Sequence, residues 1–378
     1  MKVVIAIDSF KGSISSIDAG NAVKAGVLTV YKDAIVDVLP LADGGEGTVE
    51  TLVLGMNGTK KQIQVTGPLI DMQVMATYGV VSGTVIVEMA QAAGLPIVPE
   101  QLRNPLNTTT YGVGEIIKNA IEEGYRNFII GIGGSATTDA GIGMLSALGF
   151  EFYDKYDNLV GAVGKDLANI SRIGTTNILP ELSQCKFKIA CDVNNPLYGK
   201  NGAAYIYGPQ KGATEEIVIE LDNGLQNFAS VVKKQLGKDI AKVAGTGAAG
   251  GLGYAFLVFL DAKLESGSDI IIEEIALEDR VKDADFVITG EGRLDAQTIM
   301  GKAPAAVTKI AKKYGIKTLA FAGCITDDAV QCNQSGIDAF FPILPRVMSL
   351  ADAMDVSNAQ KHLTMTTIQV FNLIGCLK

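Results

Sequence analysis

A glycine-rich stretch from Asn127 to Gly149 (NFIIGIGGSATTDAGIGMLSALG) contains the residue types that bind anions. An apolar run, residues 128–130, predicts a buried strand, and the small apolar residues 140–148 predict a helix. A glycine turn between them can direct several backbone N–H groups, and the positive end of the helix dipole, at a phosphate. The alternative is a tight structural turn whose helix is capped by Thr138 or Asp139. This stretch alone leaves both interpretations open.

Four other predicted strand ends also carry polar turns: Asp8–Lys11, Asp43–Glu46, Asp192–Asn195 and Glu291–Asp295. In open α/β sheets, ligands bind beyond the carboxyl ends of the strands. Phosphoryl transfer needs backbone donors, cations, carboxylates that hold Mg²⁺ and an acid near the attacking hydroxyl, and this chain has each of them. The pattern therefore predicts a cleft between two domains that holds a small polar substrate and a phosphate donor. For Asp8–Lys11 the structural alternative is a helix cap, and for Asp43–Glu46 it is a cap and a solvated loop.

Two matches to the G-x-G-x-x-G/A pattern keep a nicotinamide-dependent dehydrogenase of a small hydroxy acid open. Residues 245–250 fit the pattern, but the residues before them do not predict a strand. Residues 131–136 do follow a strand, but neither match has an acidic residue at a strand end about 20 residues further on. There is no P-loop pattern in the sequence. A non-catalytic sensor of sugar acids is a third candidate, although five polar strand ends are more than a sensor needs.

Strands followed by helices are predicted along most of the chain and would position these turns. Buried strands are predicted at 2–7, 34–39, 128–130, 187–190, 285–289, 318–322 and 340–344. Helices are predicted at 16–28, 48–54, 112–123, 217–236, 254–260, 303–313 and 351–376. Residues 62–66, 73–80 and 84–89 alternate apolar and polar, which indicates hairpin strands of a second, differently built domain.

Composition narrows the class of protein. The 378 residues are 48% hydrophobic, which predicts two or three domains with large cores. The net charge of −9 argues against nucleic acid or an anionic membrane as the main partner. The apolar run at residues 3–7 is too short for a signal peptide or an anchor. Five cysteines without metal-ligand spacing predict reduced thiols in a cytoplasmic protein. The single histidine, His362, argues against a His-based triad or a multi-His zinc site and is predicted on a helix surface.

Eight blocks of sequence occur in order along nearly the whole chain. They are AIDSFKGS (6–13), LPLADGGEGT (39–48), VEMAQAAGL (87–95), GIGGSATTDAGIGML (131–145), ACDVNNPLYG (190–199), GPQKGA (208–213), GTGAAGGLG (245–253) and TGEGRLDAQT (289–298). Together they resemble the glycerate kinase type 1 family.

The resemblance implies ATP-dependent phosphorylation of D-glycerate with Mg²⁺, and it favours 2-phosphoglycerate over 3-phosphoglycerate as the product. It also implies a Rossmann-like parallel-sheet domain with a second, mixed α/β domain inserted in it. We expect the first domain to comprise residues 1–58, 95–147 and 270–378, and the second to comprise residues 59–94 and 148–269. A homo-oligomer is left open.

Residue chemistry and placement then suggest individual roles. The ATP phosphates are assigned to five residues of the glycine-rich stretch: Gly133, Gly134, Ser135, Thr137 and Thr138. Asp192 is the predicted base at the attacking hydroxyl, with Asp295 as the second candidate. Glu291 or Asp295 is predicted to hold Mg²⁺.

The glycerate carboxylate is assigned to two cations, Lys11 and Arg293. Lys11 is favoured because a cation beside a helix N-terminus is poorly placed for the helix dipole alone. Polar residues predicted to assist are Ser9, Asn107, Thr108 and Thr109. Asp43 is predicted to bind a hydroxyl of the substrate.

Overall fold

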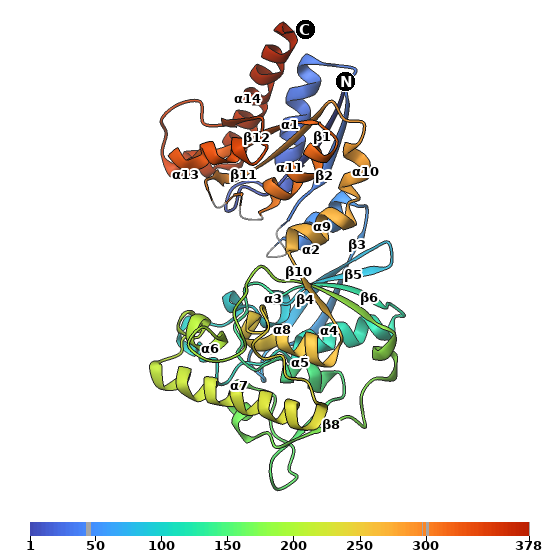
Figure 1. Cartoon of the computed structure of the whole chain (residues 1–378), viewed down its shortest axis with the longest axis vertical. Helices are drawn as coiled ribbons and strands as arrows, with labels where there is room; N and C mark the ends of the chain where they lie inside the picture. Colours follow the sequence, from blue (N-terminus) through green and yellow to red (C-terminus); the bar gives the residue numbers. More distant parts are fainter. Residues whose placement is uncertain (43–46, 297, 300–301, 378) are drawn as a thin grey trace. The chain divides into compact units, whose positions relative to one another are not determined.

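Two β-sheets, of five and six strands, organise the chain (Figure 1). The computed structural model describes residues 1–42, 47–296, 298–299 and 302–377. Contacts divide the chain into a first unit, residues 1–43, 50–57 and 268–378, and a second unit, residues 44–49 and 58–267. The second unit is therefore an insertion in the first, as predicted. The predicted cleft between domains stays a prediction.

The sheet of the first unit is entirely parallel. Its strands are β1 (Lys2–Ile7), β2 (Ile35–Pro40), β11 (Phe286–Leu294), β12 (Lys317–Ile325) and β13 (Ala339–Pro342), in the order β13-β12-β11-β1-β2. Counted within this unit, the order is 2-1-3-4-5, the doubly wound arrangement predicted as Rossmann-like. Strand order reverses between β1 and β11, which is the point where such sheets bind ligands.

Helices supply the apolar cover of this sheet. They are α1 (Ser16–Val30), α2 (Thr48–Gly55), α9 (Gly267–Glu274), α10 (Leu277–Val281), α11 (Ala303–Lys313), α12 (Gln331–Gln334), α13 (Leu350–Met354) and α14 (Val356–Cys376). Helices α1 and α14 pack together beside β1, and their apolar residues form one core with Val3, Ile5 and Ile7. The predicted surface position of His362 is wrong, since its side chain is only 9% exposed. It lies on the buried face of α14 together with Ala359 and Leu363.

The sheet of the second unit is mixed. Its order is β10-β9-β6-β5-β4-β3, with strands β3 (Thr59–Thr66), β4 (Gln73–Val81), β5 (Thr84–Glu88), β6 (Asn127–Gly131), β9 (Lys186–Ala190) and β10 (Lys263–Glu265). Strands β3, β4 and β5 form the predicted antiparallel hairpins, and β5, β6, β9 and β10 are parallel. Residues 95–147 differ from their predicted domain. They belong to the second unit because β6 pairs with β5 and β9.

The helices of the second unit enclose an aromatic core. They are α3 (Ala90–Ala93), α4 (Tyr111–Glu122), α5 (Ile142–Ala147), α6 (Ala203–Tyr207), α7 (Glu215–Leu236) and α8 (Ala248–Phe259). Phe187 stacks on Phe128, with ring centroids 5.0 Å apart, and contacts Phe256 of α8. Helix α8 is thus a core helix, as predicted. No helix in the described part of the chain has the length and hydropathy needed to span a membrane.

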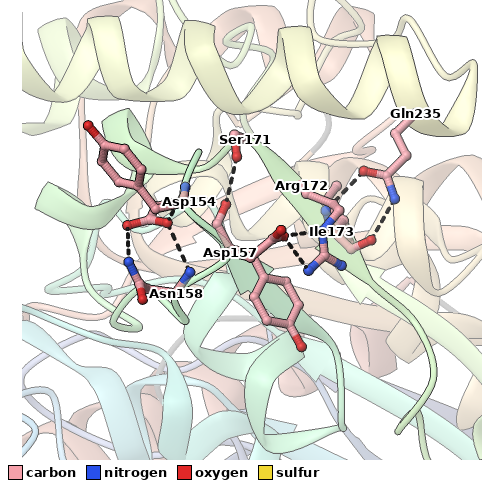
Figure 2. Close-up of polar contacts among 9 residues, drawn as sticks. Asp154, Asp157, Asn158, Ser171, Arg172, Ile173 and Gln235 are labelled. Atoms are coloured by element: carbon pink, nitrogen blue, oxygen red, sulfur yellow. Dashed lines mark hydrogen bonds and ion pairs between the residues drawn. The ribbon is translucent and has the colours of Figure 1, made fainter.

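A small hairpin of β7 (Glu151–Tyr153) and β8 (Arg172–Gly174) lies beside α7 (Figure 2). Asp157 accepts two hydrogen bonds from the guanidinium of Arg172, which also lies 3.8 Å from the centre of the Tyr153 ring. Gln235 of α7 both donates to and accepts from the backbone of Ile173. These contacts hold β8 against α7 and against the segment that follows β7.

Candidate active site

The carboxyl ends of four parallel strands in the second unit lie side by side. Strand register pairs Gly131 with Glu88 on one side and with Ala190 on the other, and Ala190 pairs with Glu265. The segments that follow these strands therefore start from one edge of the sheet. Gly133 lies two residues after Gly131, and Asp192 lies two residues after Ala190. The glycine-rich turn predicted to bind phosphate (the phosphate cradle) and the predicted base therefore begin at the same edge of the sheet.

The glycine-rich turn, residues 132–141 between β6 and α5, exposes Gly133 and Gly134. The amide of Leu95 donates to Gly134 O (2.8 Å), which fixes the turn against the segment after α3. In the described part of the chain, the amides of Gly133, Gly134 and Ser135 donate no hydrogen bond. Three unused donors in one turn at a strand end form an arrangement suited to an anion.

Asp139 holds the far side of this turn. Its Oδ2 accepts hydrogen bonds from the amide (2.8 Å) and hydroxyl (2.7 Å) of Thr110 and from the amide of Gly143 (3.3 Å). Its Oδ1 accepts from the amide of Gly141 (3.1 Å). Burial raises the pKa of Asp139, and these bonds oppose that shift. The capping alternative is therefore confirmed for Asp139. Because Asp139 fills the amino end of α5, the helix dipole is not the phosphate site that the sequence suggested.

Helix α5 begins at Ile142, two residues later than predicted. Ala140 and Gly141 both have positive φ, 49° and 73°, so the chain turns sharply before the helix. A left-handed alanine is unusual and marks a backbone that its surroundings hold in place.

Thr137 and Thr138, two of the predicted cradle residues, are fully buried. Within the described residues their hydroxyls have no hydrogen-bond partner. In this structure the exposed part of the cradle is therefore Gly133 and Gly134, with Ser135 beside them at 8% exposure.

Thr108 and Thr109 are also buried, and their hydroxyls serve the fold. Thr108 donates to Ala136 O (3.1 Å), and Thr109 accepts from the amide of Tyr111 at the start of α4 (3.1 Å). Asn107 is the exposed member of this predicted group, and its Oδ1 accepts from Lys165 Nζ (3.2 Å).

The second glycine-rich segment, residues 245–253, packs against the first. The amide of Ala140 donates to Gly250 O (3.0 Å), and a β-carbon on Gly250 would lie 2.0 Å from Thr137 O. Residues 249–251 have φ of 50°, 66° and 95°. Residues 239–244 form no strand, so the dinucleotide fingerprint lacks its structural context. These glycines allow two backbones to approach closely, and the dehydrogenase alternative loses its motivation.

Lys211 lies beneath the glycine-rich turn and was missed by sequence reasoning. It is 2% exposed, and its Nζ donates to Ser135 Oγ (2.8 Å) and Thr137 O (2.5 Å). Burial lowers the pKa of Lys211 to about 7, although the charge of Asp139 opposes the shift. The only signal in the sequence was its place in the GPQKGA block.

Asp192, the predicted base, is exposed, and its Oδ1 accepts from the amide of Gly267 (3.2 Å). Glu88, a second carboxylate at this edge, was not predicted. It is 5% exposed and accepts from the amide of Val49 (2.7 Å), at the start of α2. This bond gives Glu88 a capping role.

In the first unit, the residues that follow β1, including the predicted Ser9 and Lys11, lie beside residues 290–292 of β11. The amide of Asp8 donates to Gly290 O (2.9 Å), and Asp8 Oδ1 accepts from the amide of Ser9 (2.7 Å). A β-carbon on Gly292 would lie 3.6 Å from the amide nitrogen of Lys11. The predicted place of Arg293 on a turn is wrong: it lies within β11, because residues 291–294 continue the pairing with β12. The turn that carries Lys11 thus lies beside the strand that carries Arg293, at the switch point of the sheet. Asp43 lies outside the described residues.

Glu291 and Asp295 share one cation, Lys302, that the sequence did not single out. Lys302 Nζ lies 3.5 Å from Glu291 Oε2 and 3.8 Å from Asp295 Oδ1. Asp295 Oδ2 also lies 3.4 Å from Arg293 Nε, and Thr298 donates to Glu291 Oε1 (2.6 Å). Burial raises the pKa of Glu291, against the opposing effect of Thr298 and Lys302.

Comparison with known proteins identifies the family. Residues 3–375 match the model of the glycerate kinase family. The chain belongs to the glycerate kinase family.

Relatives of this glycerate kinase family member extend over its whole length. It is 47% identical to the glycerate kinase of Haemophilus influenzae, with 99% of each chain covered, and 46% identical to the glycerate 2-kinase of Escherichia coli, with 93% of each covered. A crystal structure of a protein from Salmonella typhimurium LT2, assigned as glycerate kinase 2, superposes with a TM-score of 0.91 at 42% identity. The match covers 100% of this chain and 98% of that one.

Asp139→Ala should destabilise this glycerate kinase family member strongly. Amides of Thr110, Gly141 and Gly143 would lose their buried acceptor, and each such loss costs about 1–3 kcal/mol. We expect the free energy of unfolding, measured in urea, to fall by about 3–5 kcal/mol. Asp154→Ala is the control: it removes an exposed carboxylate that also accepts backbone hydrogen bonds, and should cost about 1 kcal/mol or less. Equal losses in the two variants would contradict a special role for Asp139.

Lys211 should make stability depend on pH. Its pKa is about 7 in the folded protein and about 10.4 in an unfolded chain, so between these values only the unfolded state holds the proton. The stabilisation is complete above the unfolded pKa and is lost as pH falls towards 7. Relative to Lys211→Met, the wild-type free energy of unfolding should rise by about 1 kcal/mol per pH unit from pH 7.5 to 9.5. A constant difference over this range would show that the buried amine has an ordinary pKa.

Proposed function

We propose that this protein transfers the γ-phosphoryl group of ATP to a hydroxyl of D-glycerate and releases 2-phosphoglycerate and ADP. The observation that carries the proposal is the similarity, over 93% of each chain, to the E. coli protein named glycerate 2-kinase. The geometry supports it in two places. One is a turn with three unused amides, and the other is a pair of cations at the switch point of a doubly wound sheet.

The amides of Gly133, Gly134 and Ser135 would bind the phosphates of ATP. Phosphate oxygens are acceptors, and these amides donate to no other group in the described part of the chain. Positioned donors of this kind stabilise charge that builds up on a transferring phosphoryl group without having to reorganise. Thr137 and Thr138 would support the turn from inside, since both are fully buried.

Lys11 and Arg293 would bind the carboxylate of glycerate, assisted by Ser9. The Arg293 side chain is 64% exposed, so a ligand can reach its guanidinium, whose planar fork matches a carboxylate. Asn107 is a further donor with an exposed side chain.

Asp192 would act as the base. As the substrate hydroxyl attacks, its O–H proton passes to the Asp192 carboxylate, the new O–P bond forms, and the bond between the γ-phosphorus and the bridging oxygen breaks. The exposed position of Asp192 at the same sheet edge as the glycine-rich turn supports this role. Asp295 is the second candidate, although its contacts with Arg293 and Lys302 favour an ionic role.

Glu291 and Asp295 would hold Mg²⁺. Magnesium sites in kinases use one or two carboxylates, and phosphate oxygens and water complete the shell. The pair fits this pattern, since both carboxylates face one cation, Lys302, and their side chains are 12% and 14% exposed. The described residues contain no cluster of three metal-ligating side chains. The remaining Mg²⁺ ligands would therefore have to come from the nucleotide phosphates and water. When bound, Mg²⁺ would neutralise charge on the phosphates.

We also place the protein in the cytoplasm. All five cysteines are free, including the half-buried Cys185 and Cys191, which suits a reducing compartment.

Turnover of D-glycerate with Mg·ATP, followed by phosphorus NMR, tests the proposal. A 2-phosphoglycerate signal is expected. A 3-phosphoglycerate signal would keep the kinase but move the attacking hydroxyl, and with it the position required of Asp192. Absence of any phosphoester would contradict the proposed reaction and favour a binding protein.

Asp192→Asn should lower kcat by about 10²–10⁴-fold, because the amide cannot accept the proton. Asp261→Asn is a matched control. Asp261 is exposed, lies before β10 rather than at its carboxyl end, and has φ of 47°, which asparagine tolerates. Near-wild-type kcat in Asp192→Asn would move the base to another residue.

A further inference from the structure

A lysine amine is enclosed directly beneath the glycine-rich turn. Lys211, the last residue of a short 3-10 helix (Pro209–Lys211), is 2% exposed. Its Nζ donates to Ser135 Oγ at 2.8 Å and to Thr137 O at 2.5 Å. These two acceptors belong to the residues immediately before and after Ala136. The amine therefore contacts the turn from its buried side, next to the segment whose amides are unused.

A purely structural link does not need a charged group in this place. Removing an ammonium from water is costly unless an opposite charge compensates it. Both hydrogen-bond partners of Lys211 are neutral, and Asp139 is the titratable group whose charge acts on it. Asp139 already accepts four hydrogen bonds from Thr110, Gly141 and Gly143. An anion on the exposed side of the turn would supply the missing compensation.

We propose that Lys211 provides the positive charge of the nucleotide-phosphate site, acting as a positioning residue through Ser135 and the Gly133–Gly134 backbone. This inference rests on the proposed function and adds to it a residue from a segment that the substrate assignments do not use. Arriving phosphate charge favours the ammonium form of Lys211. The ammonium keeps its hydrogen bonds to Ser135 Oγ and Thr137 O, which hold the turn in the binding conformation.

Proton uptake provides a signature that a structural role would not give. The amine of the free protein has a pKa of about 7, so it is mostly neutral at pH 8.5. If phosphate binds above it, the amine must regain its proton. Asp139, the titratable group whose charge acts on Lys211, is fully buried and accepts four hydrogen bonds of its own. We therefore expect no change in the protonation of Asp139 that would mask the uptake by Lys211.

The experiment is calorimetric titration of the full-length protein with Mg·ADP at pH 8.5, in two buffers that differ in ionisation enthalpy. ADP carries fully ionised phosphates at this pH and cannot turn over. Wild-type protein should take up about one proton per ADP. In Lys211→Met we expect no uptake and a Kd that is raised about 10- to 100-fold. Lys234→Met, the same change at an exposed position of α7, should match wild type.

Steady-state kinetics separate the proposed role from general damage. Lys211→Met should raise KM for ATP with little change in KM for D-glycerate, whereas a distorted fold would affect both. If Lys211→Met fails to fold, proton uptake is compared between the wild-type protein and Ser135→Ala instead. We expect both to take up a proton on binding Mg·ADP, and Ser135→Ala to bind Mg·ADP more weakly. Loss of uptake in either protein would contradict the proposed role of Lys211.

Several results would overturn the inference. Tight ADP binding to wild type without proton uptake would show that Lys211 does not respond to the ligand, and equal uptake in Lys211→Met would assign the proton to another group. Both outcomes leave the proposed kinase function standing. Absence of ADP binding by wild type would overturn the proposed function and this inference together.

Discussion

Two buried ionisable side chains hold the glycine-rich turn in place, and the proposed site depends on them. Asp139 accepts four hydrogen bonds on the helix side, and Lys211 donates two on the strand side. Because these groups fix both flanks, the amides of residues 133–135 can remain without partners and still have one conformation. Donors that are ordered before the ligand arrives bind it without a further loss of conformational entropy.

Close backbone packing supplies the remaining rigidity. A β-carbon on Gly143 would lie 2.3 Å from Thr109 Oγ1, and one on Gly250 would lie 2.0 Å from Thr137 O. Glycine is therefore required where α5 meets the segment before α4 and where the first residues of α8 meet the glycine-rich turn. The glycine-rich segment 245–253, which resembles a dinucleotide fingerprint, is here part of the support for a different loop. Composition alone does not separate these two uses of glycine.

Much of the fold could be predicted because burial leaves a periodic pattern. The apolar strand at residues 2–7 and the alternating strands at 73–81 and 84–88 lie close to their predicted positions. The polar segments after β1, β6 and β9 follow these strands as predicted, at the edge where a parallel sheet binds ligands. Residues 291–294 were predicted as a turn but continue β11, and residues 43–46 lie outside the described residues. Strand pairing was not predictable: β6 joins the second unit through partners that lie far from it in sequence. Lys211 and Lys302 were missed because their roles arise only from tertiary contacts.

We propose that residues 133–135 bind the nucleotide phosphates on a turn that Asp139 and Lys211 hold in place. A crystal structure with Mg²⁺ and a non-hydrolysable ATP analogue tests it most directly. Phosphate oxygens should lie within about 2.7–3.2 Å of the amide nitrogens of Gly133, Gly134 and Ser135, and Lys211 should still donate to Ser135. Phosphates bound instead beyond β1 and β11, with those three amides facing water, would contradict it.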